Sequence, residues 1–272
     1  MITRGIKIAA EGMKALIDLN DVTANNIANV NTSGFKKANL TFRDLYNAAV
    51  DRIQVDSNPD NYSYRQLGTI SMGSQVDELL NEFSQGTLER TSNPLDLAIE
   101  GDGFFKLRSP ITGQISYTRN GAFAIDTKNF LVTENGDYVL DRLSRPIKLD
   151  LNQGDLKTRN NIAITEEGII ELNKEGNKEV LQQIGIFDFQ NKEDLKSLGA
   201  ARFIPQHPDK NPEMISEKYV IQQGAIEASN SNIVKEMVNM INVSRSYETL
   251  SKFVKNQSDG LSRAINLARI NS

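Results

Sequence analysis

Apolar side chains near the start of the chain recur at the spacing of a long amphipathic helix. From Gly5 onward the positions alternate in steps of three and four residues over about four heptads. This first stripe consists of Ile6, Ala9, Met13, Leu16, Asn20, Thr23, Ile27 and Val30. No proline interrupts it, so the pattern predicts one helix over residues 3–29, roughly 40 Å long at about 1.5 Å per residue.

The first stripe ends in a run of turn-forming residues, 29–34, with the sequence Asn-Val-Asn-Thr-Ser-Gly. Short polar side chains bond to nearby backbone, and glycine tolerates positive φ. We therefore expect a turn there, with Gly34 at positive φ because Phe35 must be redirected. The residues assigned to this turn are Asn26, Asn29, Asn31, Gly34 and Phe35.

A second stripe follows the N-cap candidates of residues 229–232 and continues for about 38 residues, with Gly260 as its only glycine. Its members are Ile233, Met237, Met240, Ser244, Tyr247, Ser251, Val254, Ser258, Leu261, Ile265 and Ala268, widened at the start by Val234, Val238 and Ile241. Either stripe could belong to a helix packed on its own core. Two long terminal helices that keep the heptad more often pair with each other, so we expect a coiled-coil-like layer.

Between the two stripes the pattern changes to short β-type runs about ten residues apart. The runs occupy residues 104–107, 115–117, 130–132, 138–140, 162–164, 169–172 and 184–187. Asn135-Gly136 lies between two of them and is the strongest short hairpin pattern, since a type I′ turn needs positive φ at both central positions. Residues 175–177 mark a second hairpin, and the spacing predicts an antiparallel sandwich or barrel.

The expected fold class is α+β, a mainly antiparallel β domain with paired terminal helices. Residues 1–35 and 225–272 form the expected helical assembly domain. Residues 36–94 are expected to be an extended excursion, and residues 95–224 the β domain.

The composition removes most kinds of chemistry. The chain has no cysteine and one histidine, which excludes cysteine-containing zinc sites, iron–sulfur clusters, disulfides and thiol catalysis. Asp56, Asn58 and Asp60 have the opening spacing of a calcium loop, but Leu67 stands where a bidentate Glu is required. We therefore expect no catalytic residue, no metal and no cofactor.

Charge and hydropathy exclude further partners. The net charge is −4, and residues 1–50 carry six Lys/Arg against four Asp/Glu. Residues 230–272 are also basic, but neither end of the chain has a Lys/Arg run longer than Lys36-Lys37, so nucleic acid is not an expected partner. A small-molecule substrate is not expected either. The first residues have no apolar h-region or cleavage site, and no window approaches 18 apolar residues. The chain is expected to be soluble, and cytoplasmic or exported without a cleaved signal.

Three segments of the chain resemble the flagellar rod and hook proteins, the axial proteins of the bacterial basal body. Residues 25–36 (NNIANVNTSGFK) resemble their N-terminal signature and residues 224–248 (GAIEASNSN, continuing to RSYE) their C-terminal one. Residues 84–105, from SQGTL to GDGFF, are similar to a third motif. Residues 42–46 (FRDLY) and the polar excursion before residue 76 most resemble the distal-rod branch of the family, with the proximal-rod branch as the nearest alternative.

The resemblance implies a structural subunit of the rod, in the periplasmic space, and not an enzyme. It implies subunits that leave through the flagellar export apparatus and assemble with copies of themselves and with neighbouring rod and hook proteins as an open helical tube. The residues expected to bury against the partner helix and neighbouring subunits are Ile6, Met13, Leu16, Ile27, Met237, Met240, Tyr247, Val254 and Leu261. A different extracellular fibre component and a secreted β-domain hydrolase are the two alternatives.

Overall fold

The computed structural model describes residues 2–44, 47–55, 62–71, 74–149, 162–174 and 177–270. It divides into two compact units. The first, the helical unit, comprises Met1–Asn25, Asn39–Leu79 and Val234–Ser272. The second, the β unit, comprises Asn26–Ala38 and Leu80–Ile233. The expected fold class, α+β with antiparallel sheets between two terminal helices, is confirmed.

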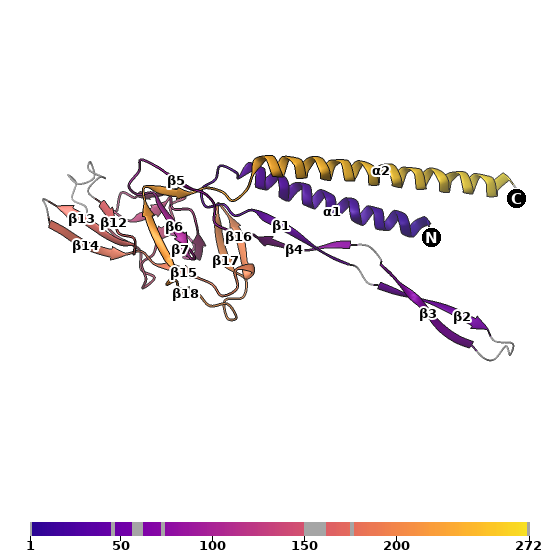
Figure 1. The fold of residues 1–272 in the computed structure, drawn as a ribbon, viewed down its shortest axis with the longest axis horizontal. Coiled ribbons are helices and arrows are strands. Elements are labelled where there is room, and N and C mark those ends of the chain that lie inside the picture. Colours follow the sequence, from indigo (N-terminus) through magenta and orange to yellow (C-terminus); the bar gives the residue numbers. More distant parts are fainter. Residues whose placement is uncertain are drawn as a thin grey trace. The chain divides into compact units, whose positions relative to one another are not determined.

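The two terminal helices begin and end close to the expected residues. Helix α1 spans Ile2–Ala28 and helix α2 spans Ile233–Ile270. They lie side by side and run in opposite directions, so that the two termini are at the same end of the pair (Figure 1). A Cβ placed on Gly12 of α1 would lie 3.3 Å from Leu250 Cδ1 of α2, so the helices pack closely there. The expected pairing of the two helices is therefore confirmed.

The residues expected to form an extended excursion contain paired strands. Strand β1 (Ala38–Asp44) pairs with β4 (Ser74–Asn81), and β2 (Asn47–Val55) forms an antiparallel pair with β3 (Tyr62–Ser71). The sequence analysis assigned no strand to this part of the chain, in which apolar and polar residues are mixed without a sustained alternation. The calcium-like spacing at residues 56–60 lies outside the described residues.

The β unit is built from one large sheet and three small ones. The strands of the large sheet are β7 (Phe104–Arg108), β8 (Ile115–Thr118), β9 (Phe123–Ile125), β10 (Leu131–Thr133), β11 (Tyr138–Val139), β15 (Ile186–Asp188), β16 (Leu195–Gly199), β17 (Arg202–Pro205) and β18 (Met214–Ile215). They follow the order β16-β17-β8-β7-β11-β10-β9, with β15 added to β7 and β18 to β15. A 3-10 helix (η3) spans Lys192–Asp194.

The small sheets of the β unit bring distant segments together. Strands β12 (Ile162–Ile164), β13 (Ile169–Lys174) and β14 (Asn177–Gln183) form the first of them. Strand β6 (Leu97–Gly101) pairs antiparallel with β19 (Tyr219–Gln223), and β5 (Leu88–Arg90) with β20 (Ala225–Glu227). The last two pairs join the middle of the chain to the segment that leads into α2.

Strand β7 separates two apolar clusters, because successive side chains of a strand point to opposite faces. Phe104 packs in an aromatic cluster with Tyr117, Phe187 and Phe203, among others. Phe105 belongs to the larger cluster. That cluster also contains Leu97, Ile99, Leu107, Phe123, Leu131, Val139, Ile147, Ile164, Ile184 and Ile221.

The seven expected β runs all contain strand, and the Asn135-Gly136 hairpin is present with a different turn. Strands β10 and β11 pair at Val132 and Tyr138, and Gly136 has φ +83°. Asn135 is not among the non-glycine residues with positive φ, so the turn is not type I′. Gly136 N–H instead donates to Thr133 O, and Thr133 N–H donates to Asp137 O, which gives a longer loop with glycine alone in the left-handed region. At the second expected hairpin β13 and β14 pair antiparallel, while residues 175–176 of its turn lie outside the described part.

The boundaries of the β unit differ from the expected domain limits. Residues 26–38, 80–94 and 225–233 group with the β strands, because their side chains and backbone bond to that unit. Among the described residues, no helix is long and apolar enough to span a membrane.

Candidate functional site

The side of α2 that packs in the helical unit follows a heptad pattern. The least exposed positions of this helix, apart from those whose burial is not described, are Glu236, Met240, Val243, Leu250, Val254, Gln257 and Leu261. The steps are three or four residues, as in a coiled-coil seam, apart from one step of seven residues between Val243 and Leu250. On α1, Ala9 and Ala15 are buried, and Ile6, Met13 and Leu16 are partly buried. The seam is therefore formed largely by small and medium-sized side chains.

The buried series differs from the expected one at alternate members. Met240, Val254 and Leu261 belong to both, but Val243, Leu250 and Gln257 replace Ser244, Ser251 and Ser258. Met237 is 49% exposed and Tyr247 39% exposed. The sequence contained both series, because apolar residues are present on two adjacent faces of α2.

A groove opens beside the seam of the helical unit. It has a volume of about 290 Å³ and is lined by both helices. The lining residues are Leu16, Ile17 and Asn20 of α1, and Val243, Ser244, Tyr247 and Glu248 of α2. Two of the residues expected to act in assembly, Leu16 and Tyr247, thus lie in this groove.

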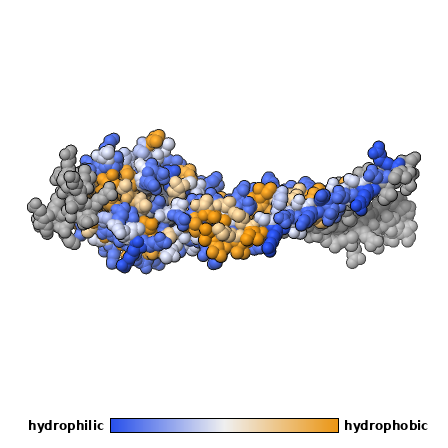
Figure 2. Space-filling model, turned by 90° about the horizontal axis from the view of Figure 1, so that it is seen from above, coloured by the Kyte–Doolittle hydropathy of each residue, from blue (hydrophilic) through white to orange (hydrophobic). Residues whose placement is uncertain are grey.

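The first turns of α2 expose a compact apolar face. Val234, Met237, Val238 and Ile241 are each about half exposed or more. They follow one another at the i, i+3, i+4 and i+7 spacing that places side chains on one side of a helix. In Figure 2 hydrophobic surface gathers where α2 begins, while the later part of the helix is largely hydrophilic. We call these four residues the apolar face of α2.

The turn after α1 is held by its own side chains. The side-chain amide of Asn26 donates to Ala38 O at 2.9 Å, and its oxygen accepts from Ala38 N–H at 3.0 Å. Asn29 Oδ1 accepts from the Thr32 hydroxyl, and Phe35 N–H donates to Thr32 O. Asn31 is exposed. Ile27, expected in the assembly stripe, is partly buried next to this turn.

Gly34 has the positive φ expected from the sequence, at +67°. The structure adds a second reason for glycine, because a Cβ at this position would lie 2.2 Å from Asn120 N. Gly34 N–H also donates to Glu227 O at 2.7 Å. A side chain here would therefore push apart two segments of the β unit.

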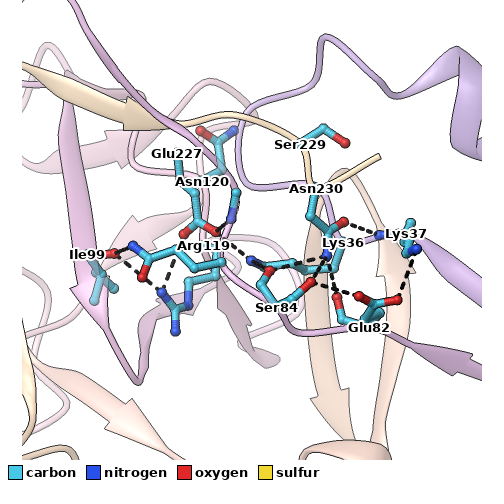
Figure 3. A network of polar contacts seen from close by, with 12 residues as sticks. Lys36, Lys37, Glu82, Ser84, Ile99, Arg119, Asn120, Glu227, Ser229 and Asn230 are labelled. Atoms are coloured by element: carbon cyan, nitrogen blue, oxygen red, sulfur yellow. Dashed lines mark hydrogen bonds and ion pairs between the residues drawn. The ribbon is translucent and has the colours of Figure 1, made fainter. Parts of the chain in front are cut away.

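Directly after the turn, three charged side chains meet in the interior of the β unit (Figure 3). Lys36 Nζ lies 2.5 Å from Glu227 Oε1, and Arg119 Nη1 lies 3.4 Å from Glu227 Oε2. The exposed fraction of the side chain is 1% for Lys36, 4% for Arg119 and 0% for Glu227. We call these three residues the buried charge cluster.

Backbone groups bond to several other polar atoms of this cluster, while the buried Arg119 Nε has no hydrogen-bond partner among the described residues. Lys36 Nζ donates to Ser84 O at 2.7 Å, and Gly86 N–H donates to Glu227 Oε1 at 2.9 Å. Arg119 donates to Gly101 O at 2.8 Å, and its guanidinium lies over the Phe104 ring at 5.3 Å. Two cations thus share one carboxylate, and carbonyl oxygens and a ring face stabilise the excess positive charge.

Burial dominates the electrostatics of these cations. It lowers the pKa of Lys36 from its ordinary value near 10.5, although the Glu227 carboxylate raises it in part. Burial also lowers the pKa of Arg119, against the attraction of Glu227 and Asp102. Glu227 is therefore required to keep both cations in the interior.

A neighbouring asparagine completes the network. Asn230 Nδ2 donates to Glu82 O at 2.7 Å and to Ser84 O at 3.2 Å, and Asn230 Oδ1 accepts from Lys37 N–H at 2.8 Å (Figure 3). The three motifs singled out in the sequence therefore meet at one place, with Lys36 from residues 25–36, Ser84 from residues 84–105 and Glu227 from residues 224–248. Sequence reasoning did not select Lys36, Arg119 or Glu227. The only indication in the sequence was that Lys36 and Glu227 lie inside two of these motifs.

Comparison with known proteins matches three segments that overlap these motifs. Residues 6–36 match the family described as "Flagella basal body rod protein", residues 98–172 the "Flagellar hook protein FlgE/F/G D1 domain" and residues 222–267 the "Flagellar basal body rod FlgEFG protein C-terminal". A flagellar basal-body rod protein FlgG from Borreliella burgdorferi is 35% identical, over 98% of this chain and 99% of the relative. The chain belongs to the flagellar basal-body rod protein family.

Other rod proteins agree with this assignment. FlgG of Agrobacterium fabrum is 34% identical over 92% of this chain and 94% of its own length. A rod protein named FlgF, from Mesorhizobium japonicum, is 27% identical over 95% of both. By homology the rod protein is of the distal-rod type, located in the flagellar basal-body rod, and it is a structural subunit and not an enzyme. The alternatives of an unrelated fibre component and a hydrolase are thereby excluded.

Proposed function

We propose that the terminal helices are the part of this rod protein that builds the rod, by packing against copies of the same chain and against neighbouring rod and hook proteins. Family membership supports assembly with axial proteins. The observation that carries the proposal is the apolar face of α2, which is exposed although most of its neighbours on the helix are polar. Burying four such side chains stabilises a contact by about 1.5–3 kcal/mol each at most.

The assembly is open and not closed. The apolar face of α2 and the groove at Leu16 and Tyr247 are different surfaces of one chain, so contact between them on two copies would be heterologous. Heterologous contacts that do not close produce helical filaments. On this proposal the expected assembly residues fall into two groups, those in the helix seam and those on the surface that neighbouring subunits cover. The residues are Ile6, Met13, Leu16, Ile27, Met237, Met240, Tyr247, Val254 and Leu261. The rod protein reaches its site through the flagellar export apparatus.

Val238→Asp tests the assembly surface. Val238 is 51% exposed, so the monomer should unfold at nearly the same temperature as the unsubstituted chain. In the rod the new carboxylate would be buried without a partner, so incorporation into basal bodies and motility should be lost. Val180→Asp is the matched control, because Val180 is 63% exposed on β14 and should assemble normally. Normal incorporation of Val238→Asp would refute the proposed surface.

A further inference from the structure

The segments flanking the two helices are bonded to each other within the β unit. Gly34 N–H donates to Glu227 O at 2.7 Å, Asn230 N–H donates to Phe35 O at 3.4 Å, and Lys37 N–H donates to the Asn230 side chain at 2.8 Å. These bonds hold residues 34–37 beside residues 227–230. The Lys36–Glu227 ion pair joins the same two segments.

The seam between the helices does not by itself determine one register. Its apolar positions repeat every seven residues, and Val243 and Leu250 are one heptad apart. Gly12, which lies against Leu250, is one heptad from Gly5, where a Cβ would meet nothing within 4 Å. Sliding α2 by one heptad, about 10 Å, would place Leu250 opposite Gly5 and Val243 opposite Gly12. The slipped pair would still be apolar and free of clashes at these positions.

The bonded segments exclude this slip. Gly34 lies 22 residues after Gly12, and Glu227 lies 23 residues before Leu250. The chain from the helix contact to the bonded segments is therefore almost equally long on the α1 side and on the α2 side. Only residues 29–33 connect α1 to the first segment, and only residues 231–232 connect the second segment to α2. Several of these connecting residues are themselves hydrogen-bonded, as Thr32 is to Asn29 and Ser231 to Ser229. The two connections therefore cannot lengthen by about 10 Å, as the slip requires.

We propose that residues 34–37 and 227–230, joined by the Lys36–Glu227 pair and by Asn230, form a register lock that determines how α1 and α2 align. Buried polar groups specify register in other helix pairs where the apolar seam permits several. Here the lock lies outside the seam and acts through the two short connections. The proposal concerns a single chain, so its failure would leave the assembly proposal untouched.

Cysteine crosslinking in the full chain tests the lock, since the natural sequence contains no cysteine. The pair G12C and L250C reports the observed register, and the pair G5C and L250C reports the slipped one. With the lock intact, a short thiol crosslinker should join the first pair and leave the second at background. Asn230→Ala should raise the slipped product about tenfold or more, because the loss of one or two net hydrogen bonds changes an equilibrium by that order.

A control and a second variant make the result decisive. Asn242→Ala removes an exposed asparagine of α2 outside the lock and should leave the slipped product at background. Glu227→Gln should act like Asn230→Ala, provided that urea unfolding shows a folded chain. Asn230 is only partly buried, so its alanine variant is expected to stay folded. Crosslinking confined to the 12–250 pair in the folded Asn230→Ala chain would overturn the proposal.

Discussion

Replacing Glu227 with glutamine removes the one carboxylate that two buried cations share. The substitution keeps the size and shape of the side chain, so packing is preserved. Lys36 and Arg119, which are 1% and 4% exposed, then remain in the interior without an anionic partner. The glutamine amide also places N–H groups where the carboxylate accepts from Lys36 Nζ and Gly86 N–H.

The expected loss of stability is large. Breaking a buried ion pair by removing one partner destabilises proteins by about 3–5 kcal/mol, against a total stability of about 5–15 kcal/mol. Urea unfolding followed by circular dichroism would measure it. At a slope of about 1–3 kcal/mol/M, the midpoint should fall by at least about 1 M. Glu89→Gln on β5 is the matched control, since Glu89 is exposed and should change stability by less than about 0.5 kcal/mol.

The pH dependence of Glu227→Gln supplies a second check. The pKa of Lys36 is already lowered by burial, and loss of the carboxylate removes the interaction that raises it. The unfolded chain then binds more protons than the folded chain between the folded pKa and the ordinary value near 10.5. The stability of the variant should therefore recover as the pH rises through that window. A loss below about 1 kcal/mol, or a loss that is the same at pH 7 and pH 10, would refute this account of the cluster.

Two further changes test the turn and the loop of the β unit. Gly34→Ala should lower the free energy of unfolding by more than the roughly 1–3 kcal/mol of a non-glycine residue at positive φ, because the new Cβ would also clash with Asn120 N. Gly113→Ala is the control, since Gly113 has φ +70° and open space around it, so this variant should show only the backbone strain. Equal losses of the two variants in urea unfolding would contradict the close approach at Gly34. Asn211→Ala removes two hydrogen bonds to the backbone of Asn191 and should lower the free energy of unfolding by about 1–3 kcal/mol. Protease cleavage in residues 206–213 should become faster. An unchanged cleavage rate would show that these bonds do not hold the loop.

The local pattern of the sequence determined the helices and several turns. Helix α1 and helix α2 follow directly from long three-and-four periodicities ended by turn residues, because periodicity and capping act over a few residues. Gly34 could likewise be assigned positive φ from its neighbours. The strands with alternating or β-branched residues were found for the same reason, whereas strands β1–β4 were not.

Only the tertiary structure decided which surfaces are buried. Two faces of α2 satisfy a heptad, and contact with α1 selected the one containing Val243 and Leu250 while Met237 stayed exposed. Lys36, Arg119 and Glu227 would each be assigned to the surface by residue type, since isolated charges are rarely buried. Their burial depends on partners up to 191 positions apart in the chain. Such a cluster is stable only when all three segments are in place, so no local pattern could have revealed it.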